Sequence, residues 1–241
     1  MSDYLCSDGY EVLAVSYFGL NGQSESLERV PVEIYEEIYS YIKENCQNSD
    51  TITVLGFSKG TELALLMSTY YDTIDNLVLF GPLAHVSKPN HLAEVSPWTY
   101  DGKELDYLDG KFGARGYSQA VISVLLNKPY DQRISMTAEL KNSTNLEEAR
   151  IKVENSSAKI LIFYGGDDRA YDAKLNSDII KEHAKSEVII HGYENAGHTF
   201  ANVIEKYGHN YRLFGGDIDS NIEADLDSKR ILLETLELWH K

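Results

Sequence analysis

The sequence predicts one α/β domain with a mostly parallel sheet, and three observations lead to that fold class. Short apolar runs rich in β-branched and aromatic residues recur along the chain, and segments with helical periodicity separate them. This alternation is typical of βαβ units, whose strands are buried on both faces. The 241 residues, 43% of them hydrophobic, can fill one large core without a linker or repeat. We therefore expect a single domain over residues 1–241, with helices on both faces of the sheet.

The first part of the chain supplies three strands and two helices. Pro31–Asn45 is an expected helix, because apolar residues recur at helical spacing behind a proline suited to a first turn. The helix Lys59–Tyr71 lies between two apolar runs of strand length. The three expected strands, each rich in β-branched or aromatic residues, are Glu11–Tyr17, Thr51–Phe57 and Asn76–Gly81.

The regular alternation lapses over residues 83–157 and then resumes. The lapse is polar and contains glycine and asparagine, so we expect these residues to form a cap after the third strand, with helices at Tyr117–Leu126 and Leu146–Val153. The strand pattern returns twice, and an amphipathic helix ends the chain. The expected elements after the cap are the strands Lys159–Tyr164 and Glu187–His191 and the helices Ala173–Ala184 and Ile222–Trp239.

A candidate nucleophile lies between the second expected strand and its helix. The residues Gly56 to Gly60 read Gly-Phe-Ser-Lys-Gly and match the pattern G-x-S-x-G in a strand-to-helix context. This is the context of a nucleophile elbow, a strained turn that exposes Ser58. The backbone N–H of Lys59 would then donate a hydrogen bond to the oxyanion of the transition state. The alternative is an ordinary turn in which Ser58 caps the helix.

A serine hydroxyl needs a general base and a group that orients this base. Two carboxylates, Asp167 and Asp168, follow the strand at Lys159–Tyr164, and His198 lies in a loop after the next strand. Serine, acid and histidine thus occur in the chain order of an α/β-hydrolase triad, at the strand ends where such sheets gather their active sites. Either aspartate could be the acid, since an aspartate after a strand often caps a loop or helix instead. The other histidines, expected in packing or surface positions, are His85, His91, His183, His191, His209 and His240.

A wider set of motifs extends from about Gly9 to the C-terminus, and consists of Gly56–Leu63, Leu66–Ser68, Gly116-Tyr117, Val124-Leu125, Gly165–Asp168, Gly197-His198 and Phe214–Gly216. With these motifs the sequence resembles the C-terminal α/β-hydrolase domain of the acyl-CoA thioesterase and bile acid-CoA:amino acid N-acyltransferase family. The resemblance implies that Ser58 accepts the acyl group, that His198 is the base and that Asp168 is the acid. Asp168 is preferred because the family's pattern is similar to G-x-x-D. Transferases of the family can carry cysteine as the nucleophile, so serine favours hydrolysis.

One part of the family's pattern is not found, namely the strand and glycine-rich loop that precede the first helix. In α/β-hydrolases that loop supplies a second oxyanion N–H. We therefore expect Glu11–Tyr17 and Thr51–Phe57 to pair directly in a sheet of about five strands. The Phe18–Gly22 loop, through the Gly19 N–H, would complete the oxyanion hole. Because Glu11–Tyr17 would be an open edge, we also expect a homodimer formed through it.

The amino-acid composition indicates which classes of partner and cofactor to expect. The net charge of −16, from 38 acidic and 22 basic residues, repels phosphate backbones and anionic membranes, so neither is an expected partner. No apolar run approaches the roughly 20 residues of a bilayer span, and the first residues lack a signal-peptide pattern, so a cytoplasmic location is expected. Only Cys6 and Cys46 are present, too few for a disulfide framework, a zinc site or a redox pair, so we expect both to be reduced thiols. Neither a metal nor another cofactor is expected.

The sequence therefore predicts a serine hydrolase that forms an acyl-enzyme at Ser58 on a small ester or thioester, acyl-CoA among them. Two alternatives stay open: acyl transfer to an amine, and a non-catalytic binding domain with a vestigial triad. The sequence assigns no substrate-binding residues, since the aromatic side chains that could line an acyl pocket could equally form a small core. These side chains are Phe80, Trp98, Tyr100, Phe112 and Tyr117.

Overall fold

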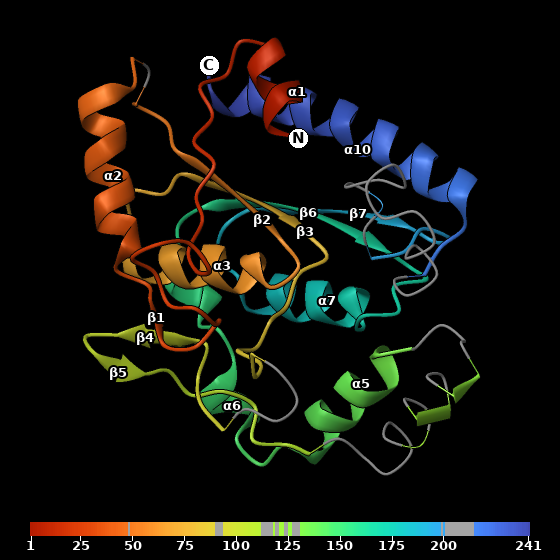
Figure 1. The fold of residues 1–241 in the computed structure, drawn as a ribbon. Helices are drawn as coiled ribbons and strands as arrows, with labels where there is room; N and C mark the ends of the chain where they lie inside the picture. Colours follow the sequence, from red (N-terminus) through yellow and green to blue (C-terminus); the bar gives the residue numbers. More distant parts are fainter. Residues whose placement is uncertain are drawn as a thin grey trace.

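Four parallel strands form the central sheet of the computed structural model, in the order β2-β3-β6-β7 (Figure 1). The structure describes residues 1–47, 49–89, 94–111, 118, 121–122, 125–126, 131–198, 200 and 215–241. The strands are β2 (Thr53–Phe57), β3 (Asn76–Phe80), β6 (Lys159–Gly165) and β7 (Val188–Tyr193). Each strand pairs with the next one of the sheet in parallel register, so all four carboxyl ends lie at one edge.

Helices cover both faces of this sheet, and alternate side chains of each strand point into different cores. Leu77 and Leu79 of β3 face one core, whereas Val78 and Phe80 face the other. The first core contains α3 (Gly60–Tyr70), α7 (Ala173–His183) and Tyr35 of α2 (Ile34–Asn45), and the second contains α1 (Ser2–Ser7) and α10 (Ile218–Trp239). Figure 1 shows α1 and α10 on one side of the sheet and α3 and α7 on the other. The predicted fold class is therefore confirmed.

The strand predicted at Glu11–Tyr17 is wrong. These residues form no strand, and β2 pairs only with β3 among the described residues, so β2 is the edge of the sheet. The side chains of Leu13 and Val15 are 42% and 41% exposed. An apolar run becomes a strand only where a neighbour completes its hydrogen-bond ladder, and the residues that the structure describes provide no such neighbour for this segment. The direct pairing expected with the Thr51–Phe57 run is thus not formed, and the predicted homodimer stays a prediction.

The cap, residues 83–157, contains elements that the sequence did not predict. They are β4 (Trp98–Tyr100), β5 (Lys103–Glu104) and α5 (Arg133–Asn142). The helix predicted at Leu146–Val153 is shorter, with α6 over Leu146–Ala149 and a 3-10 turn η1 over Val153–Asn155. Most of the helix predicted at Tyr117–Leu126 lies outside the described residues.

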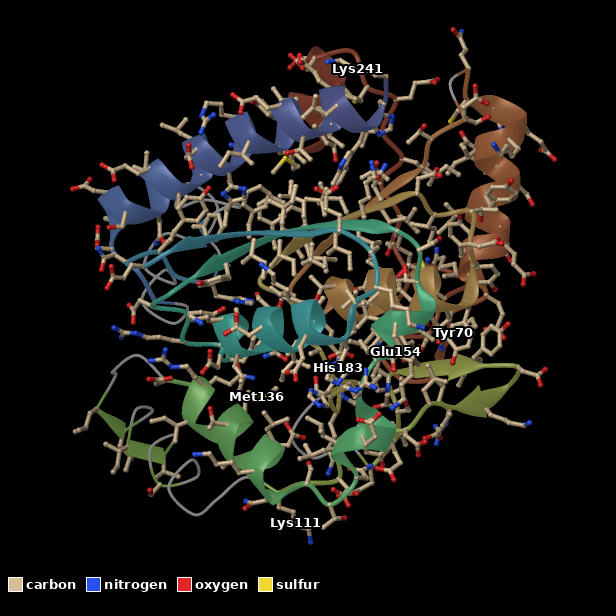
Figure 2. The ribbon with its side chains drawn as sticks, turned by 180° about the vertical axis from the view of Figure 1, so that it is seen from behind. Tyr70, Lys111, Met136, Glu154, His183 and Lys241 are labelled. Atoms are coloured by element: carbon tan, nitrogen blue, oxygen red, sulfur yellow. The ribbon has the colours of Figure 1, made fainter. Side chains whose placement is uncertain are left out.

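The contacts that tie the cap to the rest of the domain include a strand pairing and a helix packing. β1 (Val30–Pro31), which precedes α2, pairs with β4 in parallel and makes a small second sheet, β1-β4-β5. Met136 of α5 packs against Tyr171 and Ala173 beside α7, and Figure 2 shows it between these two helices. Among the described residues, none of the helices combines the length and apolar character that a membrane span requires.

Candidate active site

Ser58 occupies the tight turn between β2 and α3. Its φ of 50° is in the left-handed region, which is costly for a residue other than glycine. The Ser58 N–H donates to the carbonyl of Phe80 at the end of β3, over 2.9 Å. A Cβ on Gly56 would lie 2.8 Å from the carbonyl oxygen of Gly60, so the strand and helix backbones approach closely enough to require glycine there. The turn therefore holds the serine at the carboxyl edge of the sheet.

The structure brings Ser58, His198 and Asp168 together from three different strand ends. Ser58 Oγ lies 2.8 Å from Nε2 of His198, and Nδ1 of His198 lies 2.7 Å from Oδ2 of Asp168. The side chains of His198 and Asp168 are only 5% and 2% exposed. The other carboxylate oxygen of Asp168 accepts the N–H groups of Ala170 and Tyr171, at 2.7 and 3.2 Å. These bonds fix the carboxylate toward the imidazole.

Asp167, the alternative acid, has different partners. Its Oδ2 accepts the N–H of Gly216 over 2.8 Å and lies 3.4 Å from the guanidinium of Arg169. The two adjacent aspartates thus diverge, one toward His198 and one toward the residues before α10. Of the two carboxylates, the one that contacts the imidazole of His198 is that of Asp168.

The two backbone N–H groups expected to form the oxyanion hole differ in whether they already donate a hydrogen bond. Lys59 is the N-cap residue of α3, and within the described part of the chain its N–H has no hydrogen-bond partner. Such free N–H groups at a helix start are suited to an anion. The Gly19 N–H instead donates to the carbonyl of Ser24 over 2.8 Å, inside its own loop. The structure therefore does not support Gly19 as an oxyanion donor, because that N–H is already used to close the loop.

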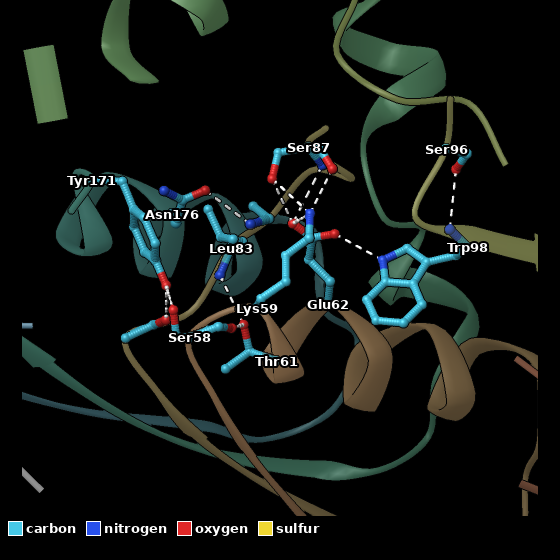
Figure 3. Close-up of polar contacts among 12 residues, drawn as sticks. Ser58, Lys59, Thr61, Glu62, Leu83, Ser87, Ser96, Trp98, Tyr171 and Asn176 are labelled. Carbon is cyan, nitrogen blue, oxygen red and sulfur yellow. Dashed lines mark hydrogen bonds and ion pairs between the residues drawn. The ribbon is translucent and has the colours of Figure 1, made fainter. Parts of the chain in front are cut away.

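Tyr171 is a buried residue at the site that the sequence analysis missed. Its hydroxyl donates to the Gly81 carbonyl over 2.6 Å and lies 3.3 Å from Ser58 Oγ (Figure 3). Its ring meets that of His198 edge-on, with centroids 4.8 Å apart. Burial raises the pKa of the Tyr171 hydroxyl well above its ordinary value, so the phenol stays protonated. No motif marks this tyrosine, and only its position three residues after Asp168 could have drawn attention to it.

The family model described as "BAAT / Acyl-CoA thioester hydrolase C terminal" matches residues 30–232. The chain belongs to this family. It is similar to the mitochondrial acyl-coenzyme A thioesterase 2 of Mus musculus, with 25% identity over 203 residues, covering 80% of this chain and 40% of that protein. It is also similar to the acyl-coenzyme A amino acid N-acyltransferase 1 of Mus musculus, with 25% identity over 200 residues, covering 80% of this chain and 43% of that protein. The chain thus spans less than half the length of these relatives.

Solved structures that are similar to this chain include the acylaminoacyl peptidase of Pyrococcus horikoshii. The TM-score is 0.48 with 14% identity, covering 87% of this chain and 27% of that one. The esterase domain of a Rhodothermus marinus protein gives a TM-score of 0.45 with 13% identity, covering 95% of this chain and 77% of that one. The fold of the chain is that of the α/β-hydrolases, as the parallel sheet and its flanking helices show.

In this member of the "BAAT / Acyl-CoA thioester hydrolase C terminal" family, two further motif residues form a buried polar cluster beside the Ser58 turn. Lys59 Nζ lies 2.7 Å from Oε1 of Glu62 and 2.9 Å from Oγ of Ser87. The indole N–H of Trp98 donates to the other oxygen of Glu62 over 2.8 Å (Figure 3). Glu62 is fully buried, and burial lowers the pKa of the Lys59 ammonium. The cluster connects the start of α3 to the cap.

The aromatic side chains considered for an acyl pocket pack elsewhere. Phe80 stacks between Phe57 and Phe163 in the core, and Tyr100 stacks on Tyr70. Trp98 is buried against Glu62 as described above. The residues named from the sequence that lie outside the described part are His91, Phe112, Gly116, Tyr117, Val124, His209 and Phe214.

Proposed function

We propose that this domain is a serine hydrolase that forms an acyl-enzyme at Ser58 from a small ester or thioester, acyl-CoA included. Water then hydrolyses the acyl-enzyme and releases the free acid. The observation that carries the proposal is the continuous hydrogen-bonded chain from Asp168 through His198 to Ser58, at 2.7 and 2.8 Å. That arrangement is what a weak serine nucleophile needs for activation. The thioesterase and acyltransferase names of the relatives agree with acyl chemistry.

In the first step, Ser58 Oγ attacks the acyl carbonyl carbon while His198 Nε2 takes the hydroxyl proton. The carbonyl π electrons move to oxygen, and the Lys59 N–H donates to the resulting oxyanion, with support from the positive end of the α3 dipole. Asp168 keeps the imidazole in the required tautomer and stabilises the imidazolium. The bond to the leaving thiol or alcohol then breaks, and that group takes the proton from His198.

In the second step, water repeats this attack on the acyl-enzyme. His198 takes the proton of the water, the bond between Ser58 Oγ and the acyl carbon breaks, and Oγ regains a proton from His198.

The second candidate function, acyl transfer, differs from hydrolysis in the molecule that accepts the acyl group. One relative carries the name amino acid N-acyltransferase, so amines are the alternative acceptors, whereas the serine nucleophile favours water. Mass spectrometry of the products, with and without an added amino acid, separates the free acid from an N-acyl product.

Two neighbouring aspartates provide a matched test of this proposal. Asp168→Asn should lower kcat by about 10³- to 10⁴-fold, because the amide favours the wrong imidazole tautomer. Asp167→Asn carries the same chemical change one residue away and should retain most activity, since Asp167 bonds Gly216 instead. Steady-state rates on acyl-CoA thioesters and p-nitrophenyl esters measure both, with Ser58→Ala as the inactive reference. A Ser58→Ala variant that hydrolyses these substrates at the normal rate would contradict the mechanism.

We also propose a domain organisation, a cellular location and an oligomeric state for the protein. Residues 1–241 are proposed to act as one domain, with residues 83–157 as the cap over its site, in the cytoplasm and without a metal or other cofactor. The sequence predicts a homodimer through Glu11–Tyr17, and that edge does not exist because these residues form no strand. The dimer proposed in its place uses the edge strand β2, since an unpaired strand edge favours pairing with a second chain. Light scattering at micromolar concentration tests it, and a monomer would contradict it.

A further inference from the structure

A small cavity lies between α5 of the cap, α7, and the segment that follows β3. Its walls are largely apolar and include Leu83, Met136, Leu140 and Tyr171, with His85 and Ser87 among its polar members. The cavity volume is about 30 Å³. The catalytic steps proposed above make no use of this space.

Hydrogen bonds place the cavity wall directly against the Ser58 turn. The Tyr171 hydroxyl lies 3.3 Å from Ser58 Oγ. The Leu83 N–H donates to the Thr61 hydroxyl over 3.1 Å, and that hydroxyl donates to the carbonyl of Ser58 over 2.6 Å. Figure 3 shows Tyr171, Leu83 and Ser87 together around the start of α3. Tyr171 is thus both a residue of the cavity wall and a direct neighbour of Ser58 Oγ.

The size of the cavity limits what it can hold. A volume of about 30 Å³ admits about two water-sized groups, which corresponds to an acyl chain of about two to four carbons. Longer chains would need Met136 or Leu140 of α5 to move. Contact between these apolar side chains and the methylene groups of an acyl chain favours binding, because it removes both from water.

His85 is a polar side chain in the largely apolar wall of this cavity. The residue is 7% exposed, and its Nδ1 has no hydrogen-bond partner within the described residues. Burial, with the nearby Arg150, lowers the pKa of His85 to about 4, so the ring is neutral near pH 7 and has one donor and one acceptor nitrogen. An unpaired buried nitrogen is costly, so a polar group that reaches it would bind favourably.

We propose that this cavity binds the acyl group of the substrate, that it accepts short chains of about two to four carbons, and that His85 binds a hydroxyl or similar polar group on that chain. The proposal rests on the proposed function, because it places the acyl carbonyl at Ser58. It adds the substrate class, namely short acyl groups with a hydrogen-bonding substituent.

Chain-length kinetics test the cavity. Acetyl-, butyryl-, hexanoyl- and octanoyl-CoA are the substrates, and kcat/KM should peak at the short end for the unaltered protein. Met136→Ala enlarges the cavity and should shift the optimum toward hexanoyl, whereas Thr137→Leu fills it and should shift the optimum toward acetyl. Met67→Ala, at a buried position of α3 that faces the first core, removes the same atoms away from the cavity and should leave the optimum unchanged.

The role of His85 is tested with butyryl- and 3-hydroxybutyryl-CoA. The unaltered protein should favour the hydroxylated substrate by about tenfold in kcat/KM, a ratio typical of one buried hydrogen bond. His85→Leu should abolish the preference, and His85→Gln should keep part of it. If thioesters are hydrolysed with no dependence on chain length or on Met136, the cavity proposal alone is overturned; an unchanged preference in His85→Leu overturns the role of His85. If no thioester is hydrolysed and Ser58 is unreactive, the proposed function fails together with this inference.

Discussion

Replacement of the buried Glu62 by glutamine should destabilise the domain strongly. Glu62 accepts hydrogen bonds from Lys59 Nζ, Ser87 Oγ and Trp98 Nε1, at 2.7, 2.8 and 2.8 Å. Glutamine retains the shape but removes the charge, and it directs an NH₂ group at one set of donors. Breaking a buried ion pair from one side costs about 3–5 kcal/mol. Because the Lys59 side chain keeps 20% exposure, we expect the lower end, about 3 kcal/mol.

Urea unfolding followed by circular dichroism and tryptophan fluorescence measures this loss. The matched control is Glu234→Gln, the same change in an exposed pair with Arg230, where about 0–1 kcal/mol is expected. Adding Lys59→Met to Glu62→Gln removes the unpaired ammonium and should recover part of the stability. A loss in Glu62→Gln no larger than that of the control would refute the view that this pair holds the start of α3.

Three further predictions concern Glu139, Tyr171 and Gly56. Burial raises the pKa of Glu139 from 4.5 to about 7, so the unfolded chain releases this proton first as the pH rises. The ionisation of Glu139 should therefore lower the free energy of unfolding by about 3 kcal/mol between pH 4.5 and pH 7, an effect opposed by His85, whose lowered pKa acts in the other direction. Urea titrations of the unaltered protein and of Glu139→Gln should differ by this amount over that range, and parallel pH profiles would contradict it. Tyr171→Phe should cost about 1–2 kcal/mol in the same assay, because the Gly81 carbonyl loses its donor, and should lower kcat; unchanged values of both would contradict the contact. Gly56→Ala should destabilise by about 1–3 kcal/mol in thermal unfolding, since its Cβ would meet the Gly60 carbonyl, and an unchanged Tm would count against that close approach.

The central sheet could be predicted because its strands carry the strongest local signal. β3 and β6 are buried on both faces, so their apolar runs are continuous and end at polar turns. The arrangement of Ser58, Asp168 and His198 could be anticipated for a related reason. Each follows a predicted strand, and parallel strands bring their carboxyl ends to one edge.

The features that failed depend on contacts that the local pattern of apolar residues does not indicate. Glu11–Tyr17 has the composition of a strand but no neighbour to pair with, which no local pattern reveals. The Gly19 N–H is taken by Ser24, a loop contact that follows from the turn geometry alone. Helix α5 escaped prediction because its buried residues are Ser135 and Glu139, which leave no apolar periodicity.

The buried groups around the site were also beyond the reach of local patterns. The pattern around Ser58 includes Lys59 and Glu62, yet their partners, Ser87 and Trp98, come from the cap. Tyr171 reaches Ser58 across 113 residues of sequence. Long-range polar contacts of this kind are set by the folded geometry, so they emerge only with the structure.

Labelling with a fluorophosphonate probe tests the central claim most directly. The probe reacts with a serine that an adjacent base activates, and intact mass with peptide mapping locates the adduct. The account predicts one adduct on Ser58 of the folded protein, labelling slower by at least about 10³-fold in His198→Ala, and none on Ser58→Ala. Folded protein that takes up no probe, or that labels at the same rate without His198, would contradict the assignment of Ser58 as an activated nucleophile.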